Sequence, residues 1–195
     1  ISGLPKINLL RHCFWKIFSK KIYKVTCPTM KTYDYLIKKK IFNKDKISIL
    51  YDPIIDISEI QKKKKETLSS KVLKDKKFII GIGRLTKQKN FSLLINFFKR
   101  IEKKKNLELV ILGVGENEKK LKMMAKELKI DDQVHFLGQQ ENVFKFLLKS
   151  ECFILTSLWE DPGFVIAEAG ISNTTVISSD CPNGPEEIVG NNGFL

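Results

Sequence analysis

Two carboxylates in the segment WEDPGFVIAEAG, Glu160 and Glu168, are the side chains of this sequence whose surroundings most clearly indicate chemistry. The segment predicts a helix that starts near Pro162 with Asp161 as its N-cap, because proline suits the first helical position and aspartate accepts hydrogen bonds from the first amides. The other residues of this helix are small or apolar. Since an unpaired buried charge is very costly, Glu168 requires either a lysine partner or a ligand.

These two carboxylates cannot be stacked neighbours on one helix face. Glu168 would lie about 9 Å along the predicted helix, whereas Glu160 precedes the helix in a loop. Carboxylates at two depths suit a polyhydroxylated ligand, because each can accept hydrogen bonds from a pair of hydroxyl groups. The amides near Gly163 and Phe164 would offer N–H groups and a positive helix end to an anion. The segment therefore favours a ligand that carries sugar, ribose and phosphate groups, with a lysine salt bridge to Glu168 as the alternative.

A second candidate is GIGRLTKQKN at residues 81–90, which follows an apolar, strand-like run. Gly81 and Gly83 allow the backbone to approach a ligand closely, and Arg84 and Lys89 supply two cations. The segment lacks the third glycine of a dinucleotide fingerprint and the lysine–serine pair of a Walker loop. We interpret it as a diphosphate clamp, with arginine as a two-pronged donor and lysine as a point charge. A tight turn with two solvated cations is the alternative.

The remaining polar motifs favour structural roles. GVGENEKKL at residues 113–121 predicts a turn into a helix, with Glu116 and Glu118 favourable in its first turn. The two histidines, His12 and His135, belong to no metal-ligand spacing, and no serine–histidine–aspartate arrangement is recognisable. We expect neither a metal site nor a bound cofactor.

Composition leaves two interpretations of the charge open. The 195 residues carry a formal net charge of +13, which rests on lysine, since arginine occurs only at positions 11, 84 and 100. This charge reflects either compositional drift on a solvated surface or a site for a polyanion. The four cysteines show no C-x-x-C spacing and predict reduced intracellular thiols. No apolar run approaches the roughly 18 residues of a membrane span.

From Lys77 onward, apolar strand-like runs alternate with amphipathic helical segments. The pattern predicts strands within 77–83, 107–113, 132–138, 151–157 and 174–180, and helices within 90–104, 116–129, 141–150 and 162–171. Strands separated by helices imply right-handed βαβ units on a parallel sheet, and such sheets bind ligands beyond the carboxyl ends of their strands. The fold class is therefore α/β, a Rossmann-like doubly wound parallel sheet with a remnant of a second α/β domain.

The first third of the chain predicts that remnant. Strands are expected within 21–27 and 46–53, on either side of a helix over 29–42 with Thr29 near its cap. A helix over 9–18 is amphipathic: basic residues surround an apolar stripe formed by Leu9, Leu10, Cys13, Phe14, Ile17 and Phe18. We expect this stripe to pack into a domain core, with an anionic membrane surface as the alternative. The charged, weakly patterned segment that follows predicts a linker, giving residues 1–56 as the first domain, 57–76 as the linker and 77–195 as the second domain.

Three motifs in this order and spacing, GRLTKQKN, the two glutamates eight positions apart, and CPNGPEEIVGNNG, resemble the C-terminal domain of family 4 glycosyltransferases. These are retaining enzymes of the GT-B fold. The resemblance covers residues 77–195, and KISILYDPIID resembles the end of that family's N-terminal domain. It implies a fragment: a donor-binding domain truncated at its C-terminal end, preceded by the last part of the acceptor-side domain.

The resemblance also implies a site for a nucleotide-sugar donor, UDP- or GDP-linked. Arg84, Lys89 and Glu160 match the catalytic positions: the two cations would neutralise the diphosphate and the charge on the leaving group, and Glu160 would face the donor sugar. Glu168 matches the carboxylate that binds ribose hydroxyls. The other donor-binding positions that it implies are Gly83, Gly163, Phe164 and Val165, with His135, Phe136, Leu137 and Gly138 lining the base pocket. Electrostatic stabilisation by two cations needs no metal.

The motif CPNGPEEI is similar to sequences found in enzymes that build bacterial surface polysaccharides. The resemblance therefore implies a hexosyltransferase with a sugar or lipid-linked acceptor, cytoplasmic and peripheral to the inner face of the cytoplasmic membrane, with no nucleic-acid partner. The sequence departs from the family at one point: the family has a small residue directly after the first glutamate, whereas Asp161 and Pro162 stand here between Glu160 and Gly163. This difference would change how the backbone approaches the donor sugar. The fragment alone is expected to bind donor weakly at best and not to turn over.

Two other classes remain open. A GT-B-like sugar-nucleotide epimerase shares the sheet but would need further acid–base carboxylates and histidines. A basic protein that binds nucleic acid or another polyanion would account for the charge, although the sequence contains no recognised nucleic-acid module or aromatic stacking pattern.

Overall fold

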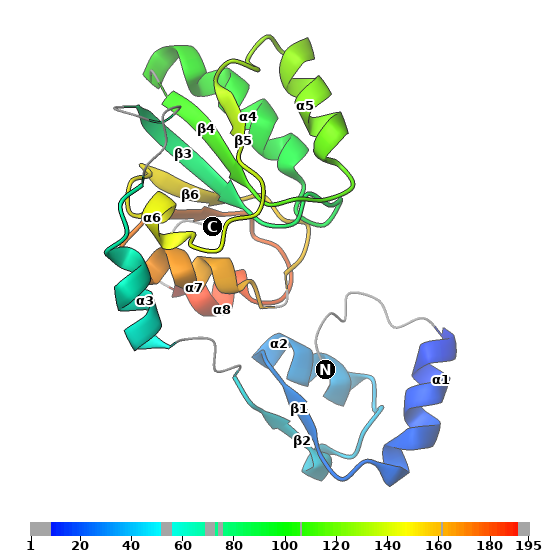
Figure 1. Cartoon of the computed structure of the whole chain (residues 1–195). Helices are drawn as coiled ribbons and strands as arrows, with labels where there is room; N and C mark the ends of the chain where they lie inside the picture. The colour runs from blue at the N-terminus through cyan, green and yellow to red at the C-terminus, as the bar shows by residue number, and fades with distance from the viewer. Residues whose placement is uncertain are drawn as a thin grey trace.

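A five-stranded parallel sheet organises the C-terminal part of the chain (Figure 1). The structure is a computed structural model that describes residues 9–51, 56–68, 73, 76–105, 107–160 and 162–190. The strands are β3 (Lys77–Ile82), β4 (Leu107–Leu112), β5 (Val134–Phe136), β6 (Cys152–Leu155) and β7 (Val176–Ser178), in the order β5-β4-β3-β6-β7. The chain runs outward from β3 to β5 and then returns to the other side of β3. A topological switch point therefore lies between β3 and β6, the position at which open α/β sheets bind ligands.

Helices cover both faces of this sheet (Figure 1). On one face α4 (Phe91–Lys105) and α5 (Glu118–Glu127) pack on a core that includes Leu94 and Phe98; on the other α6 (Phe144–Leu147), α7 (Phe164–Ile171) and α8 (Pro185–Val189) pack on a core that includes Phe78 and Phe153. Successive strand residues alternate between these two cores, as the period of two requires. The predicted α/β fold with a doubly wound parallel sheet is confirmed.

The N-terminal unit, residues 9–51, has its own small core. It contains α1 (Leu9–Phe18), a short 3-10 helix η1 (Ser19–Lys21), β1 (Val25–Cys27), α2 (Met30–Lys38), a second 3-10 helix η2 (Lys44–Lys46) and β2 (Ile47–Ile49). The strands pair in parallel and pack on Leu36 and Phe42. The side chain of Thr29 accepts a hydrogen bond from the amide of Thr32 at 3.1 Å, so the predicted N-cap of α2 is confirmed.

The apolar stripe of α1 does not pack into this core, and that expectation is wrong. Five of its members, Leu9, Leu10, Phe14, Ile17 and Phe18, are exposed. The helix is attached instead through Trp15, whose ring meets that of Phe42 with the centroids 5.7 Å apart. Amphipathic spacing identified an apolar face, but it did not determine what that face contacts.

The segment expected to be a linker contains a helix, α3 (Ile57–Lys64). The carboxylate of Asp56 caps it, accepting hydrogen bonds from the amides of Ser58 at 2.9 Å and Glu59 at 3.1 Å. The helix packs on α6 and buries Ile60, and the side-chain amide of Asn142 donates to the carbonyl of Lys63 at 2.8 Å. At least the first part of the expected linker therefore belongs to the C-terminal unit, residues 56–190.

Helix α7 starts two residues later than expected. Its first residue is Phe164, and the N-cap position is occupied by Gly163 with φ +89°, so the prediction of Pro162 in the first turn is wrong. Asp161, the expected N-cap, lies outside the described residues. A left-handed backbone at Gly163 is readily adopted only by glycine, which explains a glycine here.

The N-terminus of α2 contacts α8, which joins the two units. The carboxylate of Glu187 accepts hydrogen bonds from the amides of Met30 at 3.0 Å and Lys31 at 3.1 Å, and the ammonium of Lys31 pairs with Glu186. The first amides of a helix are unpaired and positive, so a carboxylate placed there is favourable. None of the described helices is long and apolar enough to cross a membrane.

The carboxyl edge of the sheet depends on a glycine at 113. A Cβ at Gly113 would lie 2.0 Å from the carbonyl oxygen of Gly83, and the backbone has φ +132°. We therefore expect Gly113→Ala to lower the free energy of unfolding by about 3 kcal/mol or more, measured by urea denaturation. Gly170→Ala is the matched control: this residue lies within α7 and an added Cβ meets no atom within 4 Å, so alanine should raise stability by about 0.5–1 kcal/mol. Equal stability of the two variants would contradict the prediction.

Candidate functional site

A buried ion pair lies at the switch point of the sheet. The ammonium of Lys89, in the loop after β3, is 2.6 Å from a carboxylate oxygen of Glu160, in the loop after β6, and the two side chains are 13% and 4% exposed. The hydroxyl of Ser157 donates to the same carboxylate oxygen. Two residues predicted as site residues from separate motifs are therefore in direct contact. Their charges compensate one another, as burial requires.

Backbone contacts hold the two loops together. The amide of Leu158 donates to the carbonyl of Gln88 at 2.8 Å, and the side-chain amide of Gln88 donates to the carbonyl of Trp159 at 2.9 Å. The side chain of Lys89 crosses Gly83, where an added Cβ would lie 3.1 Å from Cε of the lysine. Gly83 therefore leaves room for the lysine, and Gln88 fixes the loop that carries Glu160.

The third motif, CPNGPEE, packs against the loop that carries Glu160. The amide of Glu160 donates to the carbonyl of Pro182 at 3.0 Å. Gly184 has φ +121°, and a Cβ added there would lie 1.9 Å from the carbonyl oxygen of Pro162. All three motifs that the sequence singled out thus converge at one edge of the sheet. Gln88, Ser157 and Pro182 carried no separate signal in the sequence and were not predicted.

The other residues predicted at the diphosphate and sugar face solvent or border this pair. Arg84 is exposed and forms no ion pair with any residue that the structure describes. A Cβ at Gly163 would approach Cγ of Glu160 at 3.3 Å, so the start of α7 lies against the ion pair. Because glycine has no side chain that could cap the helix, the first amides of α7, including those of Phe164 and Val165, are not capped by a side chain at this position. A cation and a helix N-terminus are both suited to an anion.

Glu168 does not join this ion pair. It lines a separate pocket of about 230 Å³ between α3, α6 and α7, with Phe164, Ala167 and Lys63 among its neighbours. Burial raises the pKa of its carboxyl above the ordinary value of 4.5, partly opposed by the positive charge of Lys63. Within the described part of the chain it has no salt bridge, and the ammonium of Lys63 pairs instead with Glu59 at 2.6 Å. The charge of this carboxylate therefore requires either a ligand that compensates it or protonation.

The residues predicted for the base pocket lie along and after β5. The imidazole Nε2 of His135 is 2.7 Å from a carboxylate oxygen of Glu108 on β4, within the ladder. The ring of Phe136 has the ammonium of Lys122 over it at 5.6 Å from the centroid. Leu137 packs against the core on the α6–α8 face, and the carbonyl of Gly138 accepts from the amide of Gly113 at 2.7 Å. Gly138 is thereby joined to Gly113 at the carboxyl edge of the sheet.

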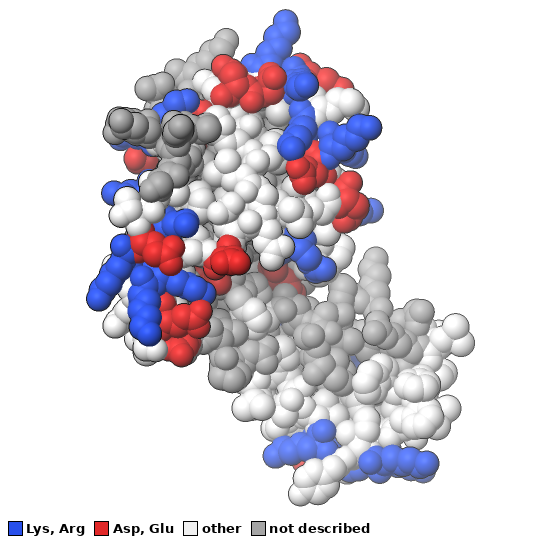
Figure 2. All heavy atoms as spheres, in the orientation of Figure 1, with Lys and Arg blue, Asp and Glu red and all other residues white. Residues whose placement is uncertain are grey.

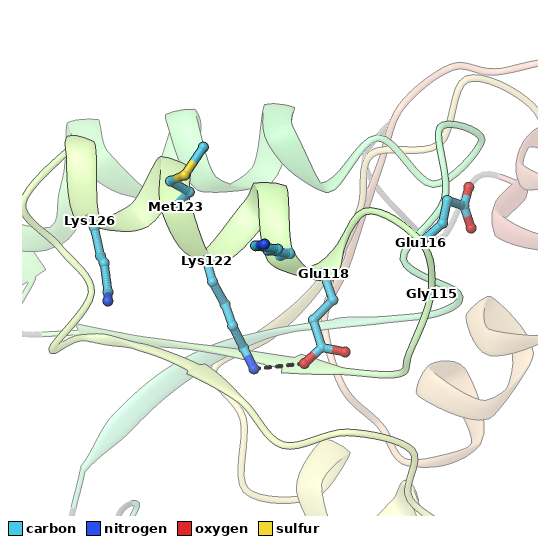
Figure 3. Close-up of a pocket in the computed structure, with 7 residues that line it drawn as sticks. Gly115, Glu116, Glu118, Lys122, Met123 and Lys126 are labelled. Atoms are coloured by element: carbon cyan, nitrogen blue, oxygen red, sulfur yellow. Dashed lines mark hydrogen bonds and ion pairs between the residues drawn. The ribbon is translucent and has the colours of Figure 1, made fainter.

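A larger groove of about 580 Å³ runs along α5 (Figure 3). It is open and lined mainly by lysine and glutamate side chains, and the ammonium of Lys122 pairs with Glu118 at 2.7 Å. None of the predicted site residues lines it. The largest of these pockets and the predicted site residues therefore lie at different places in the fold. Among the described residues, no group of three or more His, Cys, Asp and Glu side chains is arranged to hold a metal ion.

Comparison with sequence families gives a match over the C-terminal part. The family model described as glycosyl transferases group 1 matches residues 62–195. An uncharacterized glycosyltransferase from Methanocaldococcus jannaschii is 41% identical over 155 residues, covering 77% of this chain and 37% of that protein. From Campylobacter jejuni, N-acetylgalactosamine-N,N'-diacetylbacillosaminyl-diphospho-undecaprenol 4-alpha-N-acetylgalactosaminyltransferase is 37% identical over 149 residues, covering 76% of this chain and 39% of that protein. The alignments thus span less than two-fifths of these relatives.

Solved structures share the fold. A complex of Anabaena HepE with UDP superposes with a TM-score of 0.80 at 18% identity, covering 99% of this chain and 55% of that one. A variant of TarM from S. aureus, in complex with fondaparinux, alpha-GlcNAc-glycerol and UDP, gives a TM-score of 0.79 at 20% identity, covering 100% of this chain and 38% of that one. At these identities the likeness concerns the fold alone.

Removal of one partner of the buried pair should destabilise the chain. In Lys89→Met the carboxylate of Glu160 remains buried without its cation, so we expect the free energy of unfolding to fall by about 3 kcal/mol at neutral pH, measured by urea denaturation. Adding Glu160→Gln should recover part of the loss, because the uncompensated charge is removed. Lys87→Met, an exposed lysine of the same loop, should change stability little. A Lys89→Met variant as stable as Lys87→Met would contradict this account.

The raised pKa of Glu168 predicts a pH dependence of stability. Because the folded-state pKa lies above the unfolded value, its contribution to stability is present below about pH 4.5 and is lost as pH rises through the folded pKa. Glu168→Gln removes this loss, so we expect its unfolding temperature to exceed that of the parent by a few degrees at neutral pH, with the difference shrinking toward pH 4. Thermal unfolding at a series of pH values is the measurement. Glu127→Gln, an exposed glutamate of α5, is the control, and an equal response of both variants would refute the prediction.

Proposed function

This chain belongs to the glycosyl transferases group 1 family, and we propose that it supplies the donor-binding part of a retaining glycosyltransferase. The enzyme would transfer a sugar from a nucleotide-sugar donor to an acceptor hydroxyl. The observation that carries the proposal is the buried pair of Lys89 and Glu160 at the switch point of a parallel sheet. Ligands of open α/β sheets bind at that position, and the pair combines a cation for phosphate with a carboxylate for hydroxyl groups.

The proposed role of the cations is electrostatic. As the bond between the sugar and the diphosphate breaks, negative charge accumulates on the departing nucleoside diphosphate. Lys89, held in the loop after β3, would stabilise this charge from a site of low exposure, where a fixed charge is most effective. Arg84, exposed on the same loop, would close on the diphosphate as a two-pronged donor. No metal ion is required for this function.

The proposed role of Glu160 is to orient the donor sugar. Its carboxylate is already fixed by Lys89 and Ser157, so it is preorganised to accept hydrogen bonds from sugar hydroxyls. When the diphosphate arrives, the ammonium of Lys89 has three hydrogen-bond donors and can contact both phosphate and Glu160. Phe164 and Val165 would offer the first amides of α7 to the sugar or phosphate, where the positive helix end favours an anion.

Glu168 is proposed to bind the ribose hydroxyls. Its half-buried carboxylate lines a pocket with Phe164, which belongs to the same helix start that borders the ion pair. Two hydroxyl donors would satisfy the carboxylate that the protein leaves without a salt bridge among the described residues. The base is proposed to lie near Gly138, at the carboxyl edge of β5, with Phe136, Leu137 and His135 forming the wall behind it.

The donor is proposed to carry UDP or GDP, with UDP supported by the complexes of HepE and TarM, which contain UDP. The acceptor is proposed to be a sugar or a lipid-linked sugar, as the name of the Campylobacter jejuni relative describes for that protein. We further propose a role in the synthesis of cell-surface polysaccharide or glycolipid, at the inner face of the cytoplasmic membrane. Family membership favours glycosyl transfer over the epimerase and nucleic-acid alternatives.

Calorimetric titration with UDP, GDP and ADP tests the donor site. We expect one nucleoside diphosphate to bind, and Arg84→Ala to weaken its binding by about 10-fold or more, because hydrogen bonds to charged groups contribute about 1.5–3 kcal/mol. Lys87→Ala is the matched control: it removes an exposed cation of the same loop and should leave the affinity almost unchanged.

Two outcomes would contradict the proposal. Equal losses in Arg84→Ala and Lys87→Ala would indicate general attraction of anions to a basic chain. Absence of binding for every nucleoside diphosphate and nucleotide sugar, both by this chain and by a longer folded chain with both domains complete, would exclude a donor site in these residues.

A further inference from the structure

Helix α3 carries a lysine that lies beside two carboxylates. Lys63, Glu59 and Glu168 all line the pocket of about 230 Å³ between α3, α6 and α7. The ammonium of Lys63 pairs with Glu59 at 2.6 Å, whereas Glu168 has no ion pair among the described residues. One cation of the pocket is therefore paired with one carboxylate, while the other carboxylate remains unpaired.

The unpaired carboxylate is the one with the greater need of a partner. Glu59 is 59% exposed, so water stabilises its charge and the carboxylate gains little from a cation. Glu168 is half-buried, and burial raises the pKa of its carboxyl because less water reaches the charge; Lys63 opposes this rise without pairing with it. The carboxylate of Glu168 thus remains open to the pocket.

The backbone of α3 is fixed, so the partner of Lys63 depends on its side chain alone. The side-chain amide of Asn142 donates to the carbonyl of Lys63 at 2.8 Å, and the ammonium of Lys64 donates to the carbonyl of Ile171 at the end of α7, at 3.0 Å. Helix α3 packs on α6, and α6 packs on α7 (Figure 1). Glu59 and Lys63 meet because residues four positions apart lie on one face of a helix.

The other charged groups near the pocket are engaged elsewhere. In Figure 2 basic and acidic side chains intermingle at the left of the molecule, where Figure 1 places α3. Asp56 caps α3 through the amides of Ser58 and Glu59, and Glu66 lies 3.6 Å from the ammonium of Lys145 on α6. The residues that α6 and α7 contribute to the pocket besides Glu168 are uncharged: Phe144, Phe164, Ala167 and Ile171.

We propose that Glu59 positions Lys63 away from Glu168 and thereby keeps the carboxylate of Glu168 available to the hydroxyl groups of a ligand. The proposal rests on the role of Glu168 in the proposed donor site. A carboxylate paired with an ammonium has fewer free acceptor positions, and a ligand would first have to displace the ammonium. Glu59 is thus a positioning residue that acts through Lys63 and does not itself touch the ligand.

A double-mutant cycle without ligand tests the exchange of partners. Glu59→Gln removes the competing carboxylate, so Lys63 should pair with Glu168. Glu168→Gln is expected to raise the unfolding temperature of the parent at neutral pH, and this gain should disappear in the Glu59→Gln background because the carboxylate is then compensated. Glu118→Gln is the matched control background: it breaks an exposed pair with Lys122, also four positions apart, on α5, and the gain should persist there. An equal gain in both backgrounds would overturn the proposal.

Calorimetric titration with UDP, GDP and ADP tests the consequence for a ligand. Glu59→Gln should weaken binding of the nucleoside diphosphate that the parent binds by at least about 5-fold, because ribose hydroxyls must then displace Lys63 from Glu168. Adding Lys63→Met should restore the affinity, because no ammonium remains to be displaced. Lys63→Met alone and Glu118→Gln should bind like the parent. Circular dichroism checks that each variant folds.

The outcomes distinguish this proposal from the donor site itself. A loss of affinity in Glu59→Gln that Lys63→Met does not restore would overturn the proposal, because Glu59 would then contact the ligand directly. A similar loss in Lys63→Met alone would also overturn it, because the lysine would then be a ligand contact. Absence of nucleotide binding in this chain and in a longer chain with both domains complete would contradict the donor site. The ligand-free cycle would still decide whether Glu59 holds Lys63 away from Glu168.

Discussion

The buried ion pair of Lys89 and Glu160 is the interaction on which the arrangement of the site depends. Two charges at 2.6 Å with exposures of 13% and 4% are tolerated only if their geometry is well fixed. The protein fixes it by backbone contacts: Gly83 leaves space for the lysine, and Gln88 links the two loops by two hydrogen bonds. The pair therefore constrains the loops, and the loops in turn hold the pair ready for a ligand.

The topology of the sheet explains why these loops meet at all. The loops after β3 and β6 lie far apart in sequence, but β3 and β6 are neighbours in the sheet, so both loops emerge side by side at the carboxyl edge. Close backbone approaches then complete the edge, at Gly113 beside Gly83 and at Gly184 beside Pro162. A side chain at either glycine would separate the backbone segments that frame the site. The glycines in the motifs thus serve backbone packing at least as much as direct approach to a ligand.

The sequence predicted the five strands of the sheet, four of its helices and the position of Lys89 and Glu160 after strands, because strand and helix periods are strong local signals and parallel strands bring their carboxyl ends to one edge. It could not predict contacts that depend on partners distant in sequence. The pairing of His135 with Glu108 across the ladder is one such contact. The start of α7 at Phe164 is another, since the loop before it packs against Gly184. Helix α3 was missed because its lysines obscured a short apolar face, although the cap Asp56 followed by Ser58 and Glu59 was a readable signal.

Net charge proved a poor guide to function until it was resolved along the chain. The proposed donor site contains Lys89, whose charge is compensated by Glu160 in a buried pair, so the cation that matters most there contributes little to the outer surface. The excess of lysine lies instead in residues 9–51, beside an apolar helix face. A compensated pair in the proposed donor site favours specific recognition of a small anion. A ligand that attracts Lys89 must also form hydrogen bonds with Glu160, because the carboxylate otherwise loses part of its compensation. The total net charge therefore does not indicate where a small anion would bind, because the lysine of the proposed donor site is neutralised within the protein.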